Sequence, residues 1–288
     1  MPPHFDCLTD HAQQRLHLQI ACPAWQQGDL TLGPFHLQVE GPERIVILGC
    51  SGAGKSSLLR SLAGDSAARR QQVSLQQRHL ATYTAAELAR RRAVLAQATE
   101  VAFPLAVDLV IGLGRVAYQH DPHLSQIVQQ AAQLAHASHL LGRHYNQLSG
   151  GEKARVHLAR IFAQLWDQQH GLILLDEPLT ALDPGLQLEL LESLHQYAQR
   201  RAHALIAVLH DVNQALQYFS RVWLIREGRL LADIPDTANA AATNDMLTWL
   251  EQVYGVPWQI ARSQNGQPFY ACQAPVTPHT SNELYRVA

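Results

Sequence analysis

The sequence predicts an α/β fold in which a mostly parallel sheet is covered by helices. Apolar stretches at residues 44–48, 171–176 and 204–209 have the length and composition of buried strands. Helical segments follow two of them, at residues 55–63 and at about 185–200. Alternation of strands and helices along a chain is typical of a parallel sheet with helical cover. The 288 residues are enough for one large domain of this kind plus a modest appendage.

The first part of the chain alternates apolar and polar residues. Across residues 15–40 this period of two predicts strands with one buried face, and Gly28-Asp29 predicts a turn between two of them. We therefore expect an N-terminal antiparallel β subdomain. The strand at 44–48 comes next and runs into a glycine-rich turn. The helix at 55–63 should end at Gly64, because glycine is favoured just after a helix.

The middle of the chain reads as mostly helical. A short apolar strand at residues 92–97 precedes it, and residues 105–147 then have helical spacing with breaks at Gly112 and Gly114. This stretch interrupts the alternation of strands and helices. We therefore expect a helical subdomain, at about residues 98–160, that is inserted in the larger domain.

The last part of the chain predicts a closing hairpin and a small extension. Apolar strands on both sides of Glu227-Gly228 form the hairpin, and we bound the large domain at residues 1–240. Residues 241–288 predict a helix that ends at Tyr254-Gly255 and then a second hairpin. The turn of that hairpin is Asn265-Gly266, a dipeptide that strongly favours a tight turn between strands.

Composition and charge narrow the function classes. The formal net charge is −2 and we see no basic stripe, so charge does not predict nucleic-acid binding. The four cysteines form no C-x-x-C pair and the sixteen histidines have no metal-ligand spacing, so we expect reduced thiols and solvated imidazoles. The N-terminus has no signal-peptide pattern, and no stretch approaches the roughly 18 apolar residues of a membrane span. If the protein serves a membrane process, we expect other chains to cross the bilayer.

A glycine-rich segment between a buried strand and a helix has the pattern G-x-x-x-x-G-K-[ST]. Its residues are Gly49, Cys50, Ser51, Gly52, Ala53, Gly54, Lys55 and Ser56. In such a loop the backbone N–H groups and the helix N-terminus surround phosphates, and Lys55 adds a charge near the β- and γ-phosphates. The Ser56 hydroxyl is placed to ligate Mg²⁺, and we expect Ser57 to extend the set of donors. The alternative, a glycine-rich turn with a chance lysine, is disfavoured by the strand and the helix that flank it.

Polar residues end two other apolar strands. Asp176 and Glu177 end the strand at 171–176, and His210 follows the strand at 204–209. Because parallel strands end at the same edge of a sheet, we expect these side chains beside the phosphate loop. There Asp176 can hold Mg²⁺ through water, Glu177 can polarise the attacking water as general base, and His210 can contact the γ-phosphate. The alternatives are a solvated strand end and a structural histidine.

A second glycine-containing segment, Leu148 to Glu152, begins another helix. Ser149 and Glu152 have the S-x-x-E spacing of a capping box, which accounts for a helix start. Gly150 and Gly151 lie in the first helical turn, where each costs up to ~1 kcal/mol relative to alanine. This cost is understandable if bare backbone N–H groups have to approach an anion closely.

The segment LSGGE resembles the signature of ABC ATPases, and the other motifs of that family occur in the family order. They are the phosphate loop at 49–56, Gln97 of the glutamine loop, LLDEP at 174–178, Ala181-Leu182-Asp183 of the D-loop and His210 of the switch. The resemblance covers roughly residues 15–232 and implies a P-loop NTPase core of the ABC-ATPase type, with ATP and Mg²⁺ as cofactors. Cys50-Ser51 departs from the Pro-Asn of many relatives. Because the backbone binds phosphate there, we expect function to survive this difference.

The resemblance also implies a homodimer that closes two ATP sites head to tail. Each ATP would lie between the phosphate loop of one subunit and the signature segment, residues 149–152, of the other, with Asp183 of the D-loop nearby. Gln97 resembles the residue that contacts Mg²⁺ and transmits closure to the membrane subunits. Trp25 has the spacing of the aromatic residue that stacks on adenine, with a core tryptophan as the alternative and Phe35 as a less suitable candidate.

Three further stretches resemble the ATPases of bacterial hemin importers, which are kin of vitamin B12 and ferric-siderophore importers. They are RRAVLAQ and VAFP within residues 91–104, LARIFAQLW at 158–166 and LEQVYGVP at 250–257. This resemblance implies an ATPase that energises hemin uptake from the cytoplasmic face of the bacterial inner membrane, where it is peripheral. Its partners would be two transmembrane permease subunits and, indirectly, a periplasmic substrate-binding protein.

Other functions stay open at this point. A ferric-siderophore or vitamin B12 importer is the alternative within the same class. A soluble, non-transport ABC ATPase is a second class, although the chain has neither a long coiled-coil arm nor a second cassette. A P-loop kinase or GTPase is a third class, which LSGGE and His210 disfavour.

Overall fold

The computed structural model describes residues 16–97, 103–237, 240–264, 266 and 268–273. The turn residue Asn265, residues 98–102 of the stretch 91–104 and the two ends of the chain lie outside these residues. Within the described ranges, no helix has the length and the apolar character that crossing a bilayer requires.

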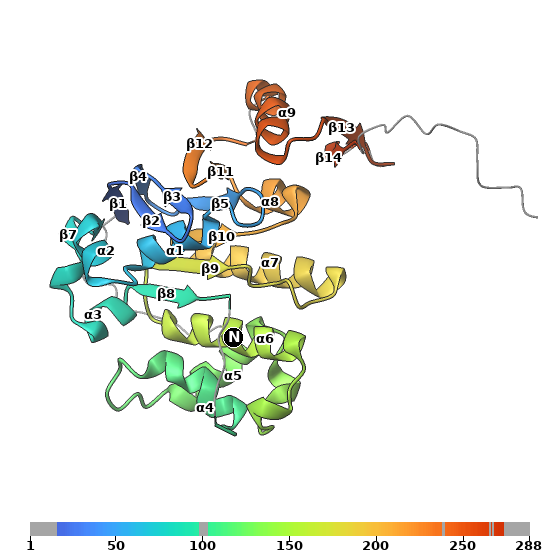
Figure 1. Cartoon of the computed structure of the whole chain (residues 1–288). Helices are drawn as coiled ribbons and strands as arrows, with labels where there is room; N and C mark the ends of the chain where they lie inside the picture. The colour runs from blue at the N-terminus through green and yellow to red at the C-terminus, as the bar shows by residue number, and fades with distance from the viewer. Residues whose placement is uncertain (1–15, 98–102, 238–239, 265, 267, 274–288) are drawn as a thin grey trace, which may run out of the picture.

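The centre of the fold is a six-stranded sheet that is mostly parallel (Figure 1). In spatial order its strands are β12 (Arg229–Ile234), β11 (Arg221–Arg226), β5 (Arg44–Leu48), β10 (Ala204–Val208), β9 (Leu172–Asp176) and β8 (Arg92–Leu95). Only the pair β11–β12 is antiparallel. β9 and β10 are buried at every position, as central strands covered on both faces should be. The predicted α/β fold is confirmed.

The order of these strands brings the predicted site segments together. β10 lies between β5 and β9, and Val208 of β10 is in register with both Ile47 and Asp176. The phosphate loop follows β5, the acidic pair ends β9, and His210 follows β10. Because these strands are parallel, all three segments lie at one edge of the sheet, as predicted. Helix α1 (Lys55–Ala63) starts at this edge and ends at Gly64, the predicted stop.

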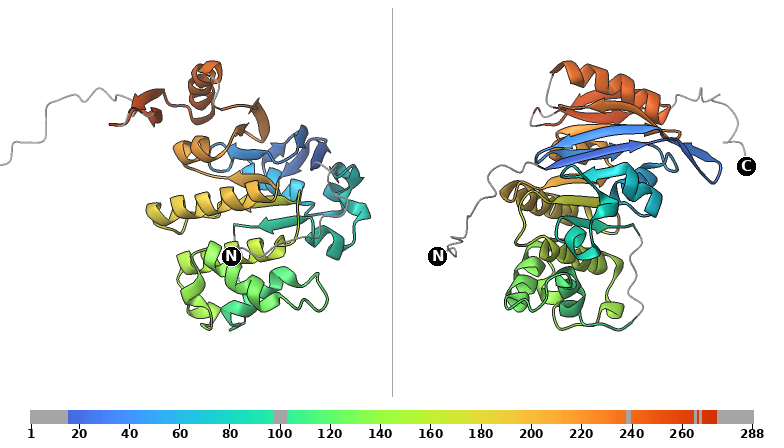
Figure 2. Two further views of the ribbon diagram at one scale, coloured as in Figure 1. Left: turned by 180° about the vertical axis from the view of Figure 1, so that it is seen from behind. Right: turned by 90° about the vertical axis from the view of Figure 1, so that its left-hand side faces the viewer.

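A second, antiparallel sheet forms the N-terminal part of the domain (Figures 1 and 2). Its strands are β4 (Phe35–Glu40), β1 (His17–Cys22), β6 (Val73–Leu75) and β7 (Arg78–His79), with β2 (Trp25–Gln27) and β3 (Leu30–Leu32) as a separate hairpin. The buried positions of β1 and β4 form one apolar cluster with α1 and the central sheet. The predicted N-terminal antiparallel subdomain is confirmed. Sequence reasoning missed β6, β7 and two short helices, α2 (Ala67–Gln72) and α3 (Ala85–Ala89).

Helices form the opposite part of the domain, drawn in green in Figure 1. α4 (Val107–Gly112) and α5 (Leu124–Leu134) pack against α6 (Gly150–Gln164), which in turn contacts the edge strand β8. α4 ends at Gly112, the first predicted break, and a 3-10 turn continues the chain through Gly114. Glycine is needed at position 114 because a Cβ atom there would lie 2.4 Å from the Arg160 carbonyl oxygen of α6. Helices α7 (Pro184–Arg200) and α8 (Val212–Tyr218) complete the cover of the sheet. Short 3-10 turns lie at Leu80–Thr82, Leu113–Arg115, Ser138–Leu140 and Tyr145–Gln147.

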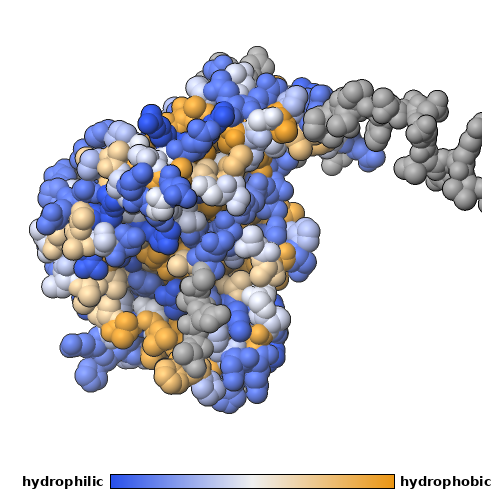
Figure 3. Space-filling model, viewed as in Figure 1, coloured by the Kyte–Doolittle hydropathy of each residue, from blue (hydrophilic) through white to orange (hydrophobic). Residues whose placement is uncertain are grey.

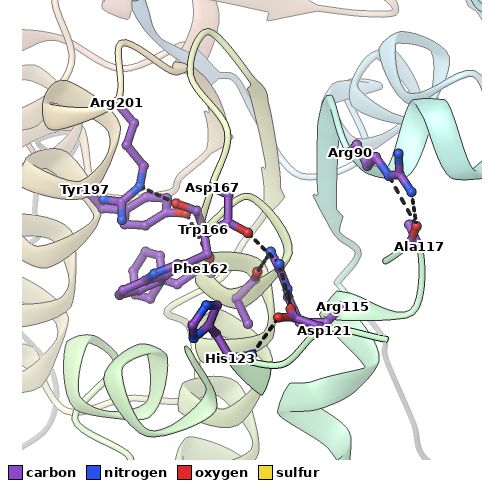
Figure 4. A network of polar contacts seen from close by, with 11 residues as sticks. Arg90, Arg115, Ala117, Asp121, His123, Phe162, Trp166, Asp167, Tyr197 and Arg201 are labelled. Atoms are coloured by element: carbon purple, nitrogen blue, oxygen red, sulfur yellow. Dashed lines mark hydrogen bonds and ion pairs between the residues drawn. The ribbon is translucent and has the colours of Figure 1, made fainter. Parts of the chain in front are cut away.

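A network of polar contacts ties the loop after α4 to the end of α6 (Figure 4). The buried Arg115 guanidinium pairs with the carboxylates of Asp121 and Asp167, at 2.7 and 2.5 Å. Burial disfavours the charge on Arg115, yet the two carboxylates raise its pKa. Next to Asp167, the Arg201 guanidinium covers the Tyr197 ring at 4.4 Å. These contacts hold the loop after α4 against the segment that follows α6 and so stabilise the packing of the helical subdomain.

The C-terminal segment packs on the same domain, beside β11 and β12 (Figures 1 and 2). Helix α9 (Ala240–Tyr254) buries Met246, Leu250 and Val253 in the main core cluster. β13 (Trp258–Arg262) and β14 (Pro268–Cys272) form the predicted hairpin. Asn213 of α8 holds this hairpin through two hydrogen bonds with the backbone of Tyr270. The domain boundaries at residue 240 and at about residues 98 and 160 stay predictions.

Candidate active site

The phosphate loop is held tightly between two strands. Gly49 approaches β11 so closely that a Cβ atom would lie 2.2 Å from the Ile225 carbonyl oxygen. At Gly54 the backbone has a φ of 101°, and a Cβ atom would lie 2.4 Å from the Leu32 side chain of β3. Glycine is therefore required at both positions, which leaves the backbone between them accessible to a phosphate group.

Lys55 lies inside the loop with only 5% of its surface exposed. Its ammonium group donates hydrogen bonds of 2.9 Å to the carbonyl oxygens of Gly49 and Cys50. Burial lowers the pKa of Lys55, and the nearby Glu177 carboxylate is the main influence in the opposite direction. A buried cation gains from an anionic partner, so this position favours a phosphate group.

Ser56 and Asp176 form a pair of oxygen ligands beside the lysine. The Ser56 hydroxyl donates a 2.8 Å hydrogen bond to Oδ1 of Asp176. Burial raises the pKa of Asp176, the Ser56 hydrogen bond lowers it, and the neighbouring Glu177 raises it. Hydroxyl and carboxylate oxygens suit Mg²⁺, and a cation would also relieve the cost of a buried carboxylate. These residues therefore fit a Mg²⁺ ion.

Glu177 is the centre of a three-residue cluster at the end of β9. The Gln97 amide donates a 2.8 Å hydrogen bond to Oε2 of Glu177, and Nε2 of His210 lies 2.6 Å from Oε1. The Glu177 backbone has a φ of 51°, in the left-handed region, which costs a residue other than glycine on the order of 1–3 kcal/mol. This strained backbone and the two side-chain contacts fix the direction of the carboxylate, so it can accept a proton from a water molecule at a defined place.

A cavity of about 340 Å³ connects these groups at the edge of the sheet. Among its lining residues are the predicted Ser51, Gly52, Gly54, Lys55, Ser56, Ser57, Gln97 and Glu177. The structure thus brings the phosphate donors, two of the proposed metal ligands, Ser56 and Gln97, and the proposed base around one space. Asp176 and His210 adjoin it through their contacts with Ser56 and Glu177.

The structure does not bring Trp25 to the described lining of this cavity. The Trp25 ring packs edge-to-face on Phe35, and the Arg69 guanidinium of α2 covers it at 3.7 Å. Trp25 is partly buried against the N-terminal apolar cluster, and its stacking on adenine stays a prediction. Gln27 and Leu30, on either side of the β2–β3 turn, line the cavity instead. Sequence reasoning missed both, because no motif marks them and only the position of the hairpin beside Gly54 reveals them.

The signature segment begins α6 with a complete capping box. The Glu152 N–H donates to Oγ of Ser149 at 3.3 Å, and the Ser149 N–H donates to Oε2 of Glu152 at 2.7 Å. These bonds, with a further one from Arg143, lower the pKa of Glu152 to about 2. Gly151 approaches the D-loop, since a Cβ atom there would lie 3.0 Å from the Ala181 carbonyl oxygen.

Within one chain the predicted residues form two separate groups. Asp183 is the N-cap of α7, and its Oδ1 accepts a 3.0 Å hydrogen bond from the Leu186 N–H. It lies in the segment that Gly151 contacts, and Ser149 and Gly150 are exposed. In the described part of the chain, neither the signature segment nor Asp183 lines the cavity beside Lys55. The signature segment and Asp183 are therefore accessible to a second molecule.

Sequence comparison finds known proteins that cover most of the chain. The family model described as ABC transporter matches residues 32–180. The hemin import ATP-binding protein HmuV of Pseudomonas putida is 41% identical over 241 residues, which are 82% of this chain and 92% of that protein. The protein of the same name from Bordetella pertussis is 40% identical over 235 residues, which are 79% of this chain and 84% of that protein.

Solved structures of ATP-binding cassettes have the same fold. A chain of an inward-facing ABC transporter, assigned to the metal-chelate type, aligns with a TM-score of 0.71 and 21% identity over 90% of this chain and 98% of its own length. A dimeric cassette bound to ADP and phosphate aligns with a TM-score of 0.64 and 20% identity over 76% of this chain and 97% of its own length. At these identities the likeness concerns the fold, and it agrees with the P-loop core inferred from the motifs.

Proposed function

We propose that this chain, which belongs to the ATP-binding subunits of ABC transporters, hydrolyses ATP to drive the import of hemin. The observation that carries the cargo assignment is the 41% identity that extends over 92% of a hemin import ATP-binding protein. The motif residues act on ATP and not on cargo. The proposed ATP hydrolysis is therefore inferred from the site residues, and the proposed cargo is inferred from the relatives.

ATP would bind with its phosphates against the backbone N–H groups of the phosphate loop. Lys55 would supply positive charge to the β- and γ-phosphates, where a buried charge acts strongly on developing negative charge. Ser56 and Asp176, with Gln97 nearby, would hold Mg²⁺. Bound there, the ion would neutralise charge on the phosphates and orient them.

Glu177 is the proposed general base. It would take a proton from a water molecule while the water oxygen forms a bond to the γ-phosphorus and the bond to the β–γ bridging oxygen breaks. Gln97 and His210 each contact one oxygen of this carboxylate. They would orient the base, and His210, whose side chain is about half exposed, could also reach the γ-phosphate.

A second copy of the chain would complete each ATP site. The start of α6 presents an exposed helix N-terminus of the kind that binds anions, yet it is not beside the Lys55 of its own chain. In a head-to-tail homodimer, residues 149–152 of one subunit would face the γ-phosphate held by the other. Gly150 and Gly151 would allow close approach, and Asp183 would lie at the same interface.

The membrane partners would dock on the helical subdomain. Phe103 and Val116 are 71% and 78% exposed, and Leu109 and Leu113 are exposed beside them. Figure 3 shows hydrophobic residues gathered on the lower part of that face, over the helical subdomain. Exposed apolar groups of this kind mark interaction surfaces. We propose that two transmembrane permease subunits cover them at the cytoplasmic face of the inner membrane, with a periplasmic substrate-binding protein on the far side.

Growth of the host bacterium with Lys55→Ala at the chromosomal locus tests the cargo. Parallel cultures would receive hemin, a ferric siderophore or inorganic iron as the sole iron source, with the wild-type gene returned as control. We expect failure on hemin and growth on the other two. Failure on the siderophore alone would move the cargo to the alternative importer, and normal growth on all three sources would contradict the proposal.

A further inference from the structure

The C-terminal end of α9 contacts the phosphate loop directly. The Cys50 thiol donates a hydrogen bond of 3.1 Å to the Val253 carbonyl oxygen. One residue earlier, the Gln252 carbonyl oxygen accepts a hydrogen bond from the Arg226 guanidinium at the end of β11. Carbonyl groups in the last turn of a helix have no partner within the helix. Here the loop and its neighbouring strand supply those partners.

Tyr254, the last residue of α9, adds a contact to the first residue of the loop. Burial raises the pKa of Tyr254 to about 12, and a hydrogen bond with the Gly49 backbone acts in the opposite direction. Gly49 is also the residue that packs directly on the Ile225 carbonyl group of β11. The start of the loop is therefore enclosed by β11 on one side and by the end of α9 on another.

The end of α9 is itself fixed in place. Met246, Leu250 and Val253 are at most 4% exposed and belong to the main core cluster. The hairpin that follows α9 is held on α8 by Asn213. Because α9 is buried in the core and the hairpin after it is bound to α8, the end of α9 is held in place. Its contacts with Gly49 and Cys50 can therefore restrain the phosphate loop. Beyond these contacts, a cavity of about 340 Å³ separates Val253 and Tyr254 from the tip of the loop.

The charges around this contact suit a loop that binds phosphate. The C-terminus of a helix carries partial negative charge, which would repel phosphates if it were bare. The Cys50 S–H group and the Arg226 cation both face carbonyl oxygens of that end. Arg226 opposes the negative charge, so the helix end can lie beside the loop without weakening its attraction for an anion.

We propose that the end of α9 is a positioning element of the phosphate loop, in which Tyr254 and Val253 hold Gly49 and Cys50 in the conformation that receives the phosphates of ATP. The inference rests on ATP binding at this loop and is independent of the cargo. Gln97 and Glu177 line the ATP cavity, whereas in the described part of the chain neither Val253 nor Tyr254 lines it. Loss of the contact should therefore weaken ATP binding and leave the hydrolytic step at saturating ATP unchanged.

Tyr254→Phe tests this role, because it deletes a hydroxyl group and keeps the ring. We expect the Kd for ATP, measured by calorimetry with Mg²⁺ present, to rise about fivefold, the effect of one hydrogen bond of typical net strength. The KM for ATP should rise with it, while kcat stays within twofold. Tyr218→Phe on α8 is the matched control and should leave Kd and KM unchanged. A Tyr254→Phe variant with wild-type Kd, or with reduced kcat at an unchanged KM, would overturn the proposal.

A pair of substitutions at Cys50 gives an independent test. Cys50→Ala removes the donor to the Val253 carbonyl, and Cys50→Ser replaces the thiol with a hydroxyl donor of similar reach. We expect a several-fold rise in the Kd for ATP for the alanine variant and a near wild-type value for the serine variant. Equal affinities of the two variants would contradict a positioning role for this contact. Absence of ATP binding by the wild-type chain would instead remove the proposed function, so the two failures are distinguishable.

Discussion

Glu177→Gln separates ATP binding from ATP hydrolysis at the centre of the site. Glutamine keeps the shape of the side chain and tolerates the same backbone conformation. It replaces one carboxylate oxygen with an NH₂ group, which cannot accept a hydrogen bond from Gln97 or His210. The variant therefore loses both its ability to take a proton and one of its two orienting contacts.

The magnitude follows from the role of a general base. Such a residue contributes about 10²- to 10⁴-fold in rate, which corresponds to about 2.7–5.4 kcal/mol of activation free energy. ATP affinity should be equal or higher, because Lys55 and Ser56 are unchanged and a negative charge near the γ-phosphate is removed. We expect the variant to accumulate as an ATP-bound dimer.

The assay is single-turnover phosphate release, with gel filtration in ATP to detect the dimer. Glu189→Gln, an exposed glutamate on α7, is the matched control and should behave as wild type. Turnover of Glu177→Gln within tenfold of wild type would refute the assignment of Glu177 as general base. Loss of ATP binding would show that the carboxylate acts in binding and not in catalysis.

Three further predictions concern other parts of the fold. Ser149→Ala should cost about 1 kcal/mol of stability through the lost N-cap and should prevent the ATP-dependent dimer, while ATP binding to the monomer persists in calorimetry. Burial lowers the pKa of His203 from its usual 6.5 to about 3, so the folded state resists protonation and stability falls as the pH drops from 6.5 toward 3. Urea unfolding of His203→Asn, which can still accept the Gly171 N–H, should show a shallower loss in this window, by up to about 1.4 kcal/mol per pH unit, and parallel profiles would contradict this. Arg115→Met should lower the unfolding free energy by about 3–5 kcal/mol because it leaves the buried Asp121 carboxylate unpaired, and a loss below 1 kcal/mol by the same method would contradict the role of this pair.

Sequence patterns predicted those parts of the site that local chemistry determines. The phosphate loop, Asp176, Glu177 and His210 each follow a strand that its apolar composition identifies, and parallel strands place their ends at one edge. The capping box at Ser149 is also local, and the structure contains both of its hydrogen bonds. These features needed no knowledge of distant contacts.

Features that depend on distant residues were not predictable in this way. The surroundings of Trp25 are set by Arg69, which lies on a short helix without a periodic pattern. The position of β10 between β5 and β9 requires a crossover that periodicity does not specify. The contact of Val253 with Cys50 joins residues 203 positions apart, and no motif links them.

The burial of two charged side chains, Lys55 and Asp176, favours the binding of ATP and Mg²⁺ at the site. Burial lowers the pKa of Lys55 and raises that of Asp176, so each charge is less stable than it would be in water. Phosphate and Mg²⁺ would compensate both groups at once. Perturbed ionisable groups of opposite sign around one cavity are typical of functional sites.

Transport of hemin in a reconstituted membrane tests the central claim most directly. Proteoliposomes that contain the chain and its permease subunits would be loaded with ATP and Mg²⁺, and movement of hemin across the bilayer would be followed with a ferric siderophore and vitamin B12 as competing cargoes. We expect hemin to move only with ATP, and Glu177→Gln to abolish the movement. ATP hydrolysis without hemin transport, or hemin transport that is equal in the Glu177→Gln variant, would contradict the account.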